Sequence, residues 1–403
     1  MRVFKLAFRN LRRQKRRSIF TGLSMFVGFV MAGFFIGWAD GTYNHIIDSF
    51  TSNRLGHIQI HARGYSDEPS LYKTIERPQR LGEELNSIQE IESWTPRIYT
   101  AGLVSVGDKS AGARLVGIDR RRENATTGMA NQVVEGRYPS APGEVMLGRG
   151  LARILAAEPG DELAVFSQAA DGSVAEELYR VAALLDTGDP ELNRSALYLG
   201  LDDARALFVL YNQAHEIAVT LHDLRRVEDL SSRLQGQFAD SGLEVSPWQE
   251  FARDFYRAMQ TDKNGMYISL VVVVIVVAIT ILNTILMSVM ERQREYGVLR
   301  ALGTRPGQIV KMVLSETALL SLASILLGAL VTLVLNSHMA AEGIKLEQAV
   351  NWGGVQLEYM KGEVNLRSFL LPTLTVLLTS FTVSIFPALK AARTEPAKTM
   401  RTF

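Results

Sequence analysis

The closest approach to a metal-binding constellation in this sequence is the pair His57 and His61, four residues apart. Residues 55–61 alternate apolar and polar side chains in the manner of a β-strand. In a strand the two imidazoles would lie on one face about 13 Å apart, which is too far to share one ion. We therefore expect both histidines to be solvated at the surface.

Motifs for catalysis and cofactor binding are also missing from the sequence. It has no phosphate-binding loop of the G-x-x-x-x-G-K-S/T kind, no G-x-S-x-G elbow and no H-E-x-x-H pair. The cysteine count of 0 excludes disulfides and thiolate chemistry. We expect a chain that is not an enzyme and binds no metal or other cofactor itself.

A charged segment near residue 300 has the pattern of a short docking helix. Residues 291–295 contain two pairs of opposite charge at i, i+3 spacing. Gly303 and Pro306 then end the helix and turn the chain. Between the charged pairs and Gly303, the side chains of Val298, Leu299, Ala301 and Leu302 form a face of apolar and small residues. We expect this face to dock on a partner; the alternative is a charged linker that only connects two membrane spans.

Four apolar runs must position this segment. Each is roughly 20 residues or more, enough to cross a bilayer core of about 30 Å. Glu316, near the start of the third run, is the only Asp, Glu, Lys or Arg in any of them. We predict four transmembrane helices at residues 18–39, 266–290, 313–337 and 368–389.

The distribution of basic residues predicts the orientation. Residues 1–17 carry eight Lys and Arg, and no acidic residue precedes Asp40, which places the N-terminus in the cytoplasm. Apolar positions in this stretch have helical spacing, so it is an interfacial amphipathic helix, a basic anchor that only sets topology, or both. The order then gives a large outer domain, a cytoplasmic coupling loop, a short outer loop and a cytoplasmic tail at residues 40–265, 291–312, 338–367 and 390–403.

The outer domain has the pattern of a mixed α+β fold. Hairpins are predicted at residues 98–118 and 163–184, and a helix at 245–262 runs into the second span as a stalk. Small residues recur every four positions at Gly33, Gly37 and Gly41. Such a stripe is a dimer seam or a packing surface for the second span. Within that span, Asn283 is expected to make an interhelical hydrogen bond.

Several segments resemble FtsX/MacB-type ABC transporter permeases, the type VII class that works by mechanotransmission. Residues 287–316 look like the family signature, with Glu-Arg-x-Arg-Glu at 291–295 followed by Tyr296 and Gly297. Residues 6–13, 143–161 and 386–397 are also similar to family segments, in the same order along the chain.

The resemblance implies an architecture of two permeases, identical or paralogous, above a dimer of cytoplasmic ATPase chains that hold ATP and Mg. The outer domain would stand on stalks continued from the first two spans, and the 291–312 loop would act as a coupling helix. The residues carried over to ATPase coupling are Glu291, Arg294, Glu295, Tyr296, Gly297, Arg300, Ala301, Leu302 and Gly303.

Residues 56–65 resemble the lipoprotein-releasing (LolC/LolE) subgroup, which implies extraction of lipoproteins from a bacterial inner membrane and delivery to a periplasmic carrier. The residues expected to contact the cargo are Phe34, Phe35, Trp38, Met266, Tyr267 and Leu270. Two alternatives stay open: efflux of small molecules or peptides through a periplasmic adaptor, and regulation of a cell-wall hydrolase. The net charge of +1 gives no indication of nucleic-acid binding.

Overall fold

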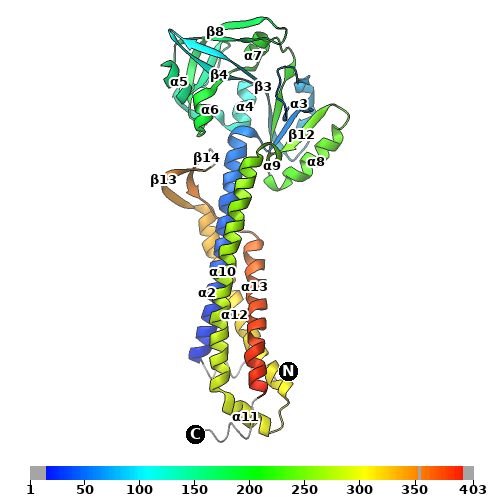
Figure 1. Ribbon diagram of the computed structural model, residues 1–403, viewed down its shortest axis with the longest axis vertical. Helices are drawn as coiled ribbons and strands as arrows, with labels where there is room; N and C mark the ends of the chain where they lie inside the picture. The colour runs from blue at the N-terminus through cyan, green and yellow to red at the C-terminus, as the bar shows by residue number, and fades with distance from the viewer. Residues whose placement is uncertain (1–14, 353–354, 394–403) are drawn as a thin grey trace. The chain divides into compact units, whose positions relative to one another are not determined.

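The computed structural model describes residues 15–352 and 355–393 and divides into two compact units (Figure 1). The helical unit contains the described parts of Met1–His45, Met259–Leu346 and Tyr359–Phe403. The α/β domain contains Ile46–Ala258 and the described residues of Glu347–Glu358. Helices α2 and α10 each contribute residues to both units.

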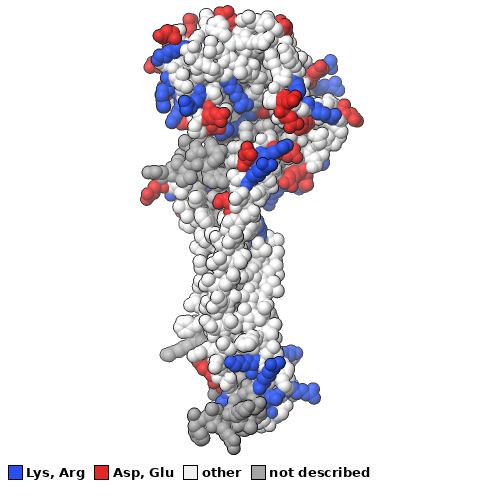
Figure 2. Space-filling model, viewed as in Figure 1, with Lys and Arg blue, Asp and Glu red and all other residues white. Residues whose placement is uncertain are grey.

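Within the described residues, four helices of the helical unit are long and apolar enough to cross a membrane. Each is longer than the span predicted for it. A short helix, α11 (Gln293–Ala301), follows the second of them. The long helices are α2 (Lys15–Phe50), α10 (Arg253–Glu291), α12 (Pro306–Ala341) and α13 (Arg367–Ala392). The middle of this bundle carries no Lys, Arg, Asp or Glu on the face that Figure 2 shows, whereas Lys and Arg gather at the α11 end.

The glycine stripe of α2 packs against α12, the start of α13 and the segment between β14 (Val355–Met360) and α13, and not against α10 as one alternative predicted. A Cβ on Gly33 would lie 2.8 Å from the Thr332 side chain, and one on Gly37 would lie 2.2 Å from Asn336. A Cβ on Gly41 would lie 2.2 Å from the backbone of Gly362. Because these approaches leave no room for a methyl group, the stripe is used inside the chain and is not a free dimer seam.

Asn283 does not make the predicted hydrogen bond within the chain. Its side chain is exposed on α10, and no hydrogen bond to it occurs within residues 15–352 and 355–393. Asn336 on α12 makes the interhelical contact instead, because its Nδ2 donates to the carbonyl of Gly33 at 3.3 Å.

The α/β domain is built on a mixed sheet of ten strands among the described residues, in the order β12-β1-β11-β3-β4-β9-β6-β8-β5, with β7 paired to β3 and β8. The β4–β9 and β6–β8 pairs are parallel and the others antiparallel. The strands are β1 (Ile58–Ala62), β3 (Ile91–Val106), β4 (Lys109–Ile118), β5 (Val133–Gly136), β6 (Glu144–Gly148), β7 (Glu162–Gln168), β8 (Val174–Leu185), β9 (Ala196–Gly200), β11 (Glu216–Leu221) and β12 (Leu243–Pro247).

Two small sheets lie outside this order, one of β2 (Ile75–Glu76) with β10 (Gln213–Ala214) and one of β13 (Ile344–Trp352) with β14 (Val355–Met360). The second occupies much of the stretch predicted to be a loop at residues 338–367. Helices and helical turns of the domain are η1 (Thr51–Leu55), α3 (Pro78–Asn86), α4 (Arg120–Thr127), η2 (Met129–Gln132), α5 (Arg149–Leu155), α6 (Pro190–Ser195), α7 (Leu201–Phe208), η3 (Leu224–Arg226), α8 (Val227–Gln237) and α9 (Trp248–Phe251).

The predicted hairpins are present as β3–β4 and β7–β8. The helix predicted at residues 245–262 is wrong at its start, because residues 243–247 form strand β12 beside β1. Leu243, Val245 and Pro247 alternate with polar residues, which is a strand period, and Pro247 disfavours helix in the residue before it. A short helix, α9, then precedes α10.

A buried ionic cluster lies within the α/β domain. Arg97, 3% exposed, donates to both oxygens of Glu123 at 2.6 and 3.0 Å and to Glu216 at 2.9 Å. Thr95 and Tyr99 supply further hydrogen bonds to these carboxylates, at 3.1 and 3.0 Å. Burial opposes the charge, but Glu123 and Glu216 raise the pKa of Arg97 well above its ordinary value. Arg97 therefore stays charged and is shared by the two carboxylates.

Candidate functional site

Helix α11 is fastened to the end of the helical bundle by Arg292 and Tyr296. The Arg292 side chain donates to Glu295 at 2.9 Å and to both oxygens of Glu316 at 3.1 and 2.9 Å. Tyr296 is 1% exposed and packs in a cluster with residues of α12 and α13, including Ile309 and Ala388. Arg292 also lies over the Tyr296 ring at 5.3 Å. One face of α11 is thereby held in a defined position.

The opposite face of α11 is open. Leu302 is 79% exposed and Val298 is 43% exposed. Gly303 ends the helix in a left-handed conformation, with φ 89°, and Pro306 begins α12. Among the residues expected to couple to an ATPase, Tyr296 and Gly297 are buried and Arg300 is half-buried. The exposed members of that set are Glu291, Arg294, Glu295, Ala301, Leu302 and Gly303.

A narrow pocket lies near the other end of the helical unit, between α2, α10 and α13. Its walls are apolar and include Phe35 and Ile36 from α2 and Met266 and Leu270 from α10. Four of the six residues expected to contact cargo line it together: Phe35, Met266, Tyr267 and Leu270. Phe34 and Trp38 are not among its lining residues.

Charged residues that sequence reasoning missed form the rim of this pocket. Arg367 at the start of α13 pairs with Asp40 at 3.3 Å and donates to the Tyr267 hydroxyl. Lys263 lies over the Tyr43 ring at 5.1 Å. Apolar walls below a charged rim suit an amphiphilic ligand. The signal for Lys263 was available, because it lies one helical turn before Tyr267 on α10.

His57 is buried, at 2% exposed, contrary to the expectation of a solvated side chain. Its Nδ1 accepts the backbone N–H of Leu221 at 2.8 Å, so Nε2 carries the hydrogen that faces Ser52 Oγ at 3.0 Å. Ser52 in turn donates to Asp48 at 2.8 Å. Since neither nitrogen of His57 is free to accept the Ser52 proton, this Ser-His-Asp grouping is not a nucleophilic triad. Burial lowers the pKa of His57 to about 4, and Asp48 opposes that shift.

His61 is also buried, at 4% exposed, and it stacks on Tyr65 at 5.0 Å. His215 stacks on the same tyrosine at 5.5 Å and accepts the backbone N–H of Tyr99 at 2.9 Å. Burial lowers the pKa of His215. Two of the three histidines therefore satisfy backbone donors that the sheet leaves unpaired. The alternation of apolar and polar residues predicted one solvent-exposed face for β1, but side chains on both of its faces are buried.

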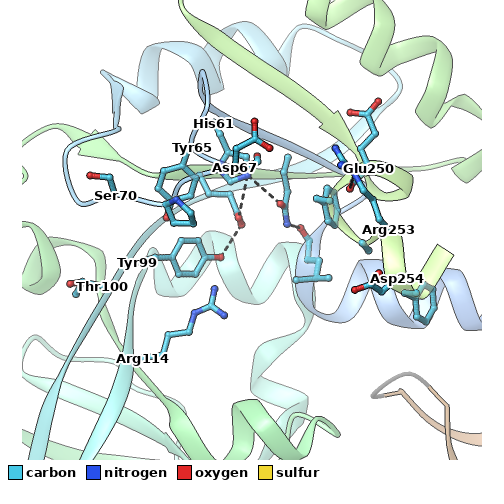
Figure 3. Close-up of a pocket in the computed structure, with 18 of the residues that line it drawn as sticks. His61, Tyr65, Asp67, Ser70, Tyr99, Thr100, Arg114, Glu250, Arg253 and Asp254 are labelled. Carbon is cyan, nitrogen blue, oxygen red and sulfur yellow. Dashed lines mark hydrogen bonds and ion pairs between the residues drawn. The ribbon is translucent and has the colours of Figure 1, made fainter. Parts of the chain in front are cut away.

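His61 and Tyr65 line a large pocket of the α/β domain, with a volume of about 1020 Å³ (Figure 3). Tyr99 and Arg114 come from strands β3 and β4, and Glu250, Arg253 and Asp254 come from α9 and the start of α10. No group of three or more His, Cys, Asp or Glu residues that could hold a metal occurs anywhere in the described part of the chain.

Known families match both units of the molecule. The family described as MacB-like periplasmic core domain matches residues 18–237, and the FtsX-like permease C-terminal family matches residues 267–396. The chain therefore belongs to the FtsX-like permeases that carry a MacB-like periplasmic core domain, which confirms the resemblance noted in the sequence.

Three relatives illustrate the range of the family. The lipoprotein-releasing system transmembrane protein LolC of Neisseria meningitidis is 24% identical over 76% of this chain and 77% of its own length. LolE of Haemophilus influenzae, from the same kind of system, is 24% identical over 87% of this chain and 86% of its own. The macrolide export ATP-binding/permease protein MacB of Bordetella avium is 35% identical over 33% of this chain and 18% of its own.

Proposed function

We propose that the chain is a non-catalytic transmembrane subunit of an ABC transporter that extracts lipidated proteins from a bacterial inner membrane. The observation that carries this proposal is the similarity to LolC and LolE along most of the chain, in both units. ATP hydrolysis belongs to separate ATPase chains, and a second permease, identical or paralogous, completes the membrane part.

The α11 end of the helical unit is where the ATPase would bind. Val298 and Leu302 offer an apolar face, while Arg292 and Tyr296 hold α11 against the bundle. A docking helix must be firmly attached if a push on it is to move the helices behind it. Lys and Arg gather at this end (Figure 2), which supports a cytoplasmic position under the positive-inside rule.

The pocket between α2, α10 and α13 is the proposed place for the lipid part of the cargo. The pocket has a volume of only about 20 Å³, so its helices would have to separate before Phe35, Met266 and Leu270 could provide an apolar wall for acyl chains. Arg367 and Lys263 at the rim suit the polar linkage at the head of a lipid anchor. In this orientation the α/β domain lies on the periplasmic side.

Movement of α2 and α10 would reach the α/β domain through a stiff connection inside that domain. Phe50, the last residue of α2, stacks on Phe255 in the first turn of α10 at 3.8 Å and 7°. Arg54 pairs with Asp189 at 2.7 Å, which ties the turn after α2 to the loop before α6. These contacts support mechanotransmission, in which helix motion is passed on and no channel is needed.

Efflux through a periplasmic adaptor is the second candidate, supported by the 35% identity to MacB over part of the chain. In this case a soluble small molecule or peptide, and not a lipidated protein, would stimulate ATP hydrolysis.

The test is lipoprotein release from proteoliposomes that contain the chain with the ATPase and permease that copurify from its host. We expect ATP-dependent release of a triacylated lipoprotein. Met266→Ala with Leu270→Ala should reduce it about tenfold, since each substitution removes apolar surface from the pocket wall. A matched control is Leu326→Ala with Leu330→Ala, because these leucines are 72% and 62% exposed on α12. Equal loss in both double variants, or release of a soluble macrolide only, would contradict the proposal.

A further inference from the structure

The large pocket of the α/β domain (Figure 3) differs in chemistry from the apolar pocket of the helical unit, and no step of the proposed extraction uses it. We propose that it binds a polypeptide segment that carries a basic side chain. This inference rests on the proposed function, since the segment would belong to the protein part of the lipidated cargo.

The lining mixes apolar side chains with charged ones, and the charged groups disfavour an acyl chain. Four carboxylates and two guanidinium groups face the pocket, together with neutral polar side chains such as Gln59, Ser70 and Thr100. Burying an acyl chain there would desolvate these groups without giving them partners. A peptide offers donors and acceptors at every residue and can satisfy them.

The charges of the lining favour a cation over an anion. Glu216 shares the Arg97 guanidinium, at 2.9 Å, with Glu123. Asp67, Glu250 and Asp254 remain, and no ion pair of these three occurs within the described residues. Of the two guanidinium groups, Arg114 lies over the Tyr99 ring at 4.8 Å and Arg253 donates to the backbone carbonyl of Glu250 at 3.0 Å. The lining therefore holds four carboxylates against two cations. A lysine or arginine of the bound segment would give these carboxylates a partner.

Aromatic rings give the pocket a second means of holding a peptide. Tyr65 is buried between His61 and His215 in a stack with spacings of 5.0 and 5.5 Å. The stack and the hydrogen bond from Tyr99 to Glu216, at 3.0 Å, fix the rings before any ligand arrives. A preformed polar and aromatic surface lowers the entropy cost of binding a flexible segment.

The test is fluorescence anisotropy of a short labelled peptide of glycine, serine and lysine with the purified full chain in detergent. The peptide carries no lipid, so its binding is measured separately from extraction. We expect saturable binding that weakens as salt is raised. Asp67→Asn with Asp254→Asn should weaken it about fivefold, because each exposed ion pair contributes modestly. The same peptide with glutamate in place of lysine should bind more weakly than the lysine peptide.

A matched control is Asp108→Asn with Asp240→Asn, which removes the same charge from exposed positions of the domain outside the pocket. Equal binding by the two double variants, or equal binding of the glutamate peptide, would overturn the inference. If peptide binding fails while lipoprotein release succeeds, only this inference falls. If the peptide binds as described but lipoprotein release fails, only the proposed function falls.

Discussion

Two buried arginines, one in each unit of this molecule, organise their surroundings in different ways. Arg97 in the α/β domain is 3% exposed, and both of its partners, Glu123 and Glu216, are buried as well. Arg292 beside α11 is 6% exposed, yet its partner Glu295 has a side chain that is 52% exposed. The first cluster is buried, with only Glu216 and Tyr99 lining the large pocket, whereas the second opens to solvent next to an apolar face.

The difference separates a structural role from a positioning role. Folding depends on every member of a buried ionic cluster, because removing one member leaves a buried charge without a partner. An ionic cluster that is open to solvent can lose a member with a smaller loss of stability. The role of such a cluster at Arg292 is to orient α11. We therefore expect changes at Arg97 to affect folding and changes at Arg292 to affect coupling.

The largest effect is expected from Arg97→Met. It leaves Glu123 and Glu216 buried without a counter-ion and should lower the free energy of unfolding of the α/β domain by about 3–5 kcal/mol. Urea unfolding of the full chain, followed by tryptophan fluorescence, measures this because Trp94 is buried in the same domain. Arg121→Met, at an exposed position, is the control and should change stability by less than about 0.5 kcal/mol. Equal stability of Arg97→Met and Arg121→Met would contradict the structural role assigned to the Arg97 cluster.

The second expected effect is also on stability and concerns His57. Its neutral ring accepts the backbone N–H of Leu221, which the sheet leaves unpaired. Its pKa in the folded state is lowered to about 4, from an ordinary value of 6.5. The stabilisation is therefore complete above pH 6.5 and is lost as the pH falls toward 4, by about 3 kcal/mol at most. Unfolding measured across this range should show that His57→Gln, which keeps an acceptor but does not titrate, loses this part of the pH dependence. An unchanged pH profile would show that His57 does not cause it.

Arg292→Met is expected to change the stability of the protein least. Its effect should be on the coupling between ATP hydrolysis and lipoprotein release. Release of α11 from Glu316 should reduce lipoprotein-stimulated ATP hydrolysis about tenfold, while the α/β domain unfolds as in the wild type. Glu316→Gln, which keeps the contact between Arg292 and Glu295, should have a weaker effect. Full coupling in Arg292→Met, or loss of stability in the α/β domain, would reverse the assigned roles.

Much of the architecture follows from periodicity in the sequence. The apolar runs were long enough to predict the four helices, and the turns around Asp108 and Asp171 predicted two hairpins that the structure contains. The break at residues 243–252 was missed because an apolar strand beside a helix start resembles one longer amphipathic helix. The stalk predicted to run into the second span is present, because α10 begins at Arg253, and α2 likewise continues beyond its span to Phe50.

The sites were predicted less completely, because they depend on residues far apart in sequence. Arg292 and Glu316 were each noticed, but a spacing of 24 residues gives no local signal of their ion pair. Phe35 and Met266 were placed in one pocket, whereas Arg367 at its rim comes from a third helix. The burial of His57 depends on β11 and β12 on either side of β1, a pairing that alternation does not reveal.

The most direct test of the account is whether a separate ATPase binds the exposed face of α11. The measurement is recovery of ATPase with the tagged full chain after mild solubilisation from its host, for wild type and for Arg300→Glu with Leu302→Glu. The control is Arg121→Glu with Val174→Glu, the same chemical change at exposed positions of the α/β domain. The account predicts ATPase with the wild type and the control but not with the α11 variant. Recovery of the ATPase with all three, or with none, would contradict it.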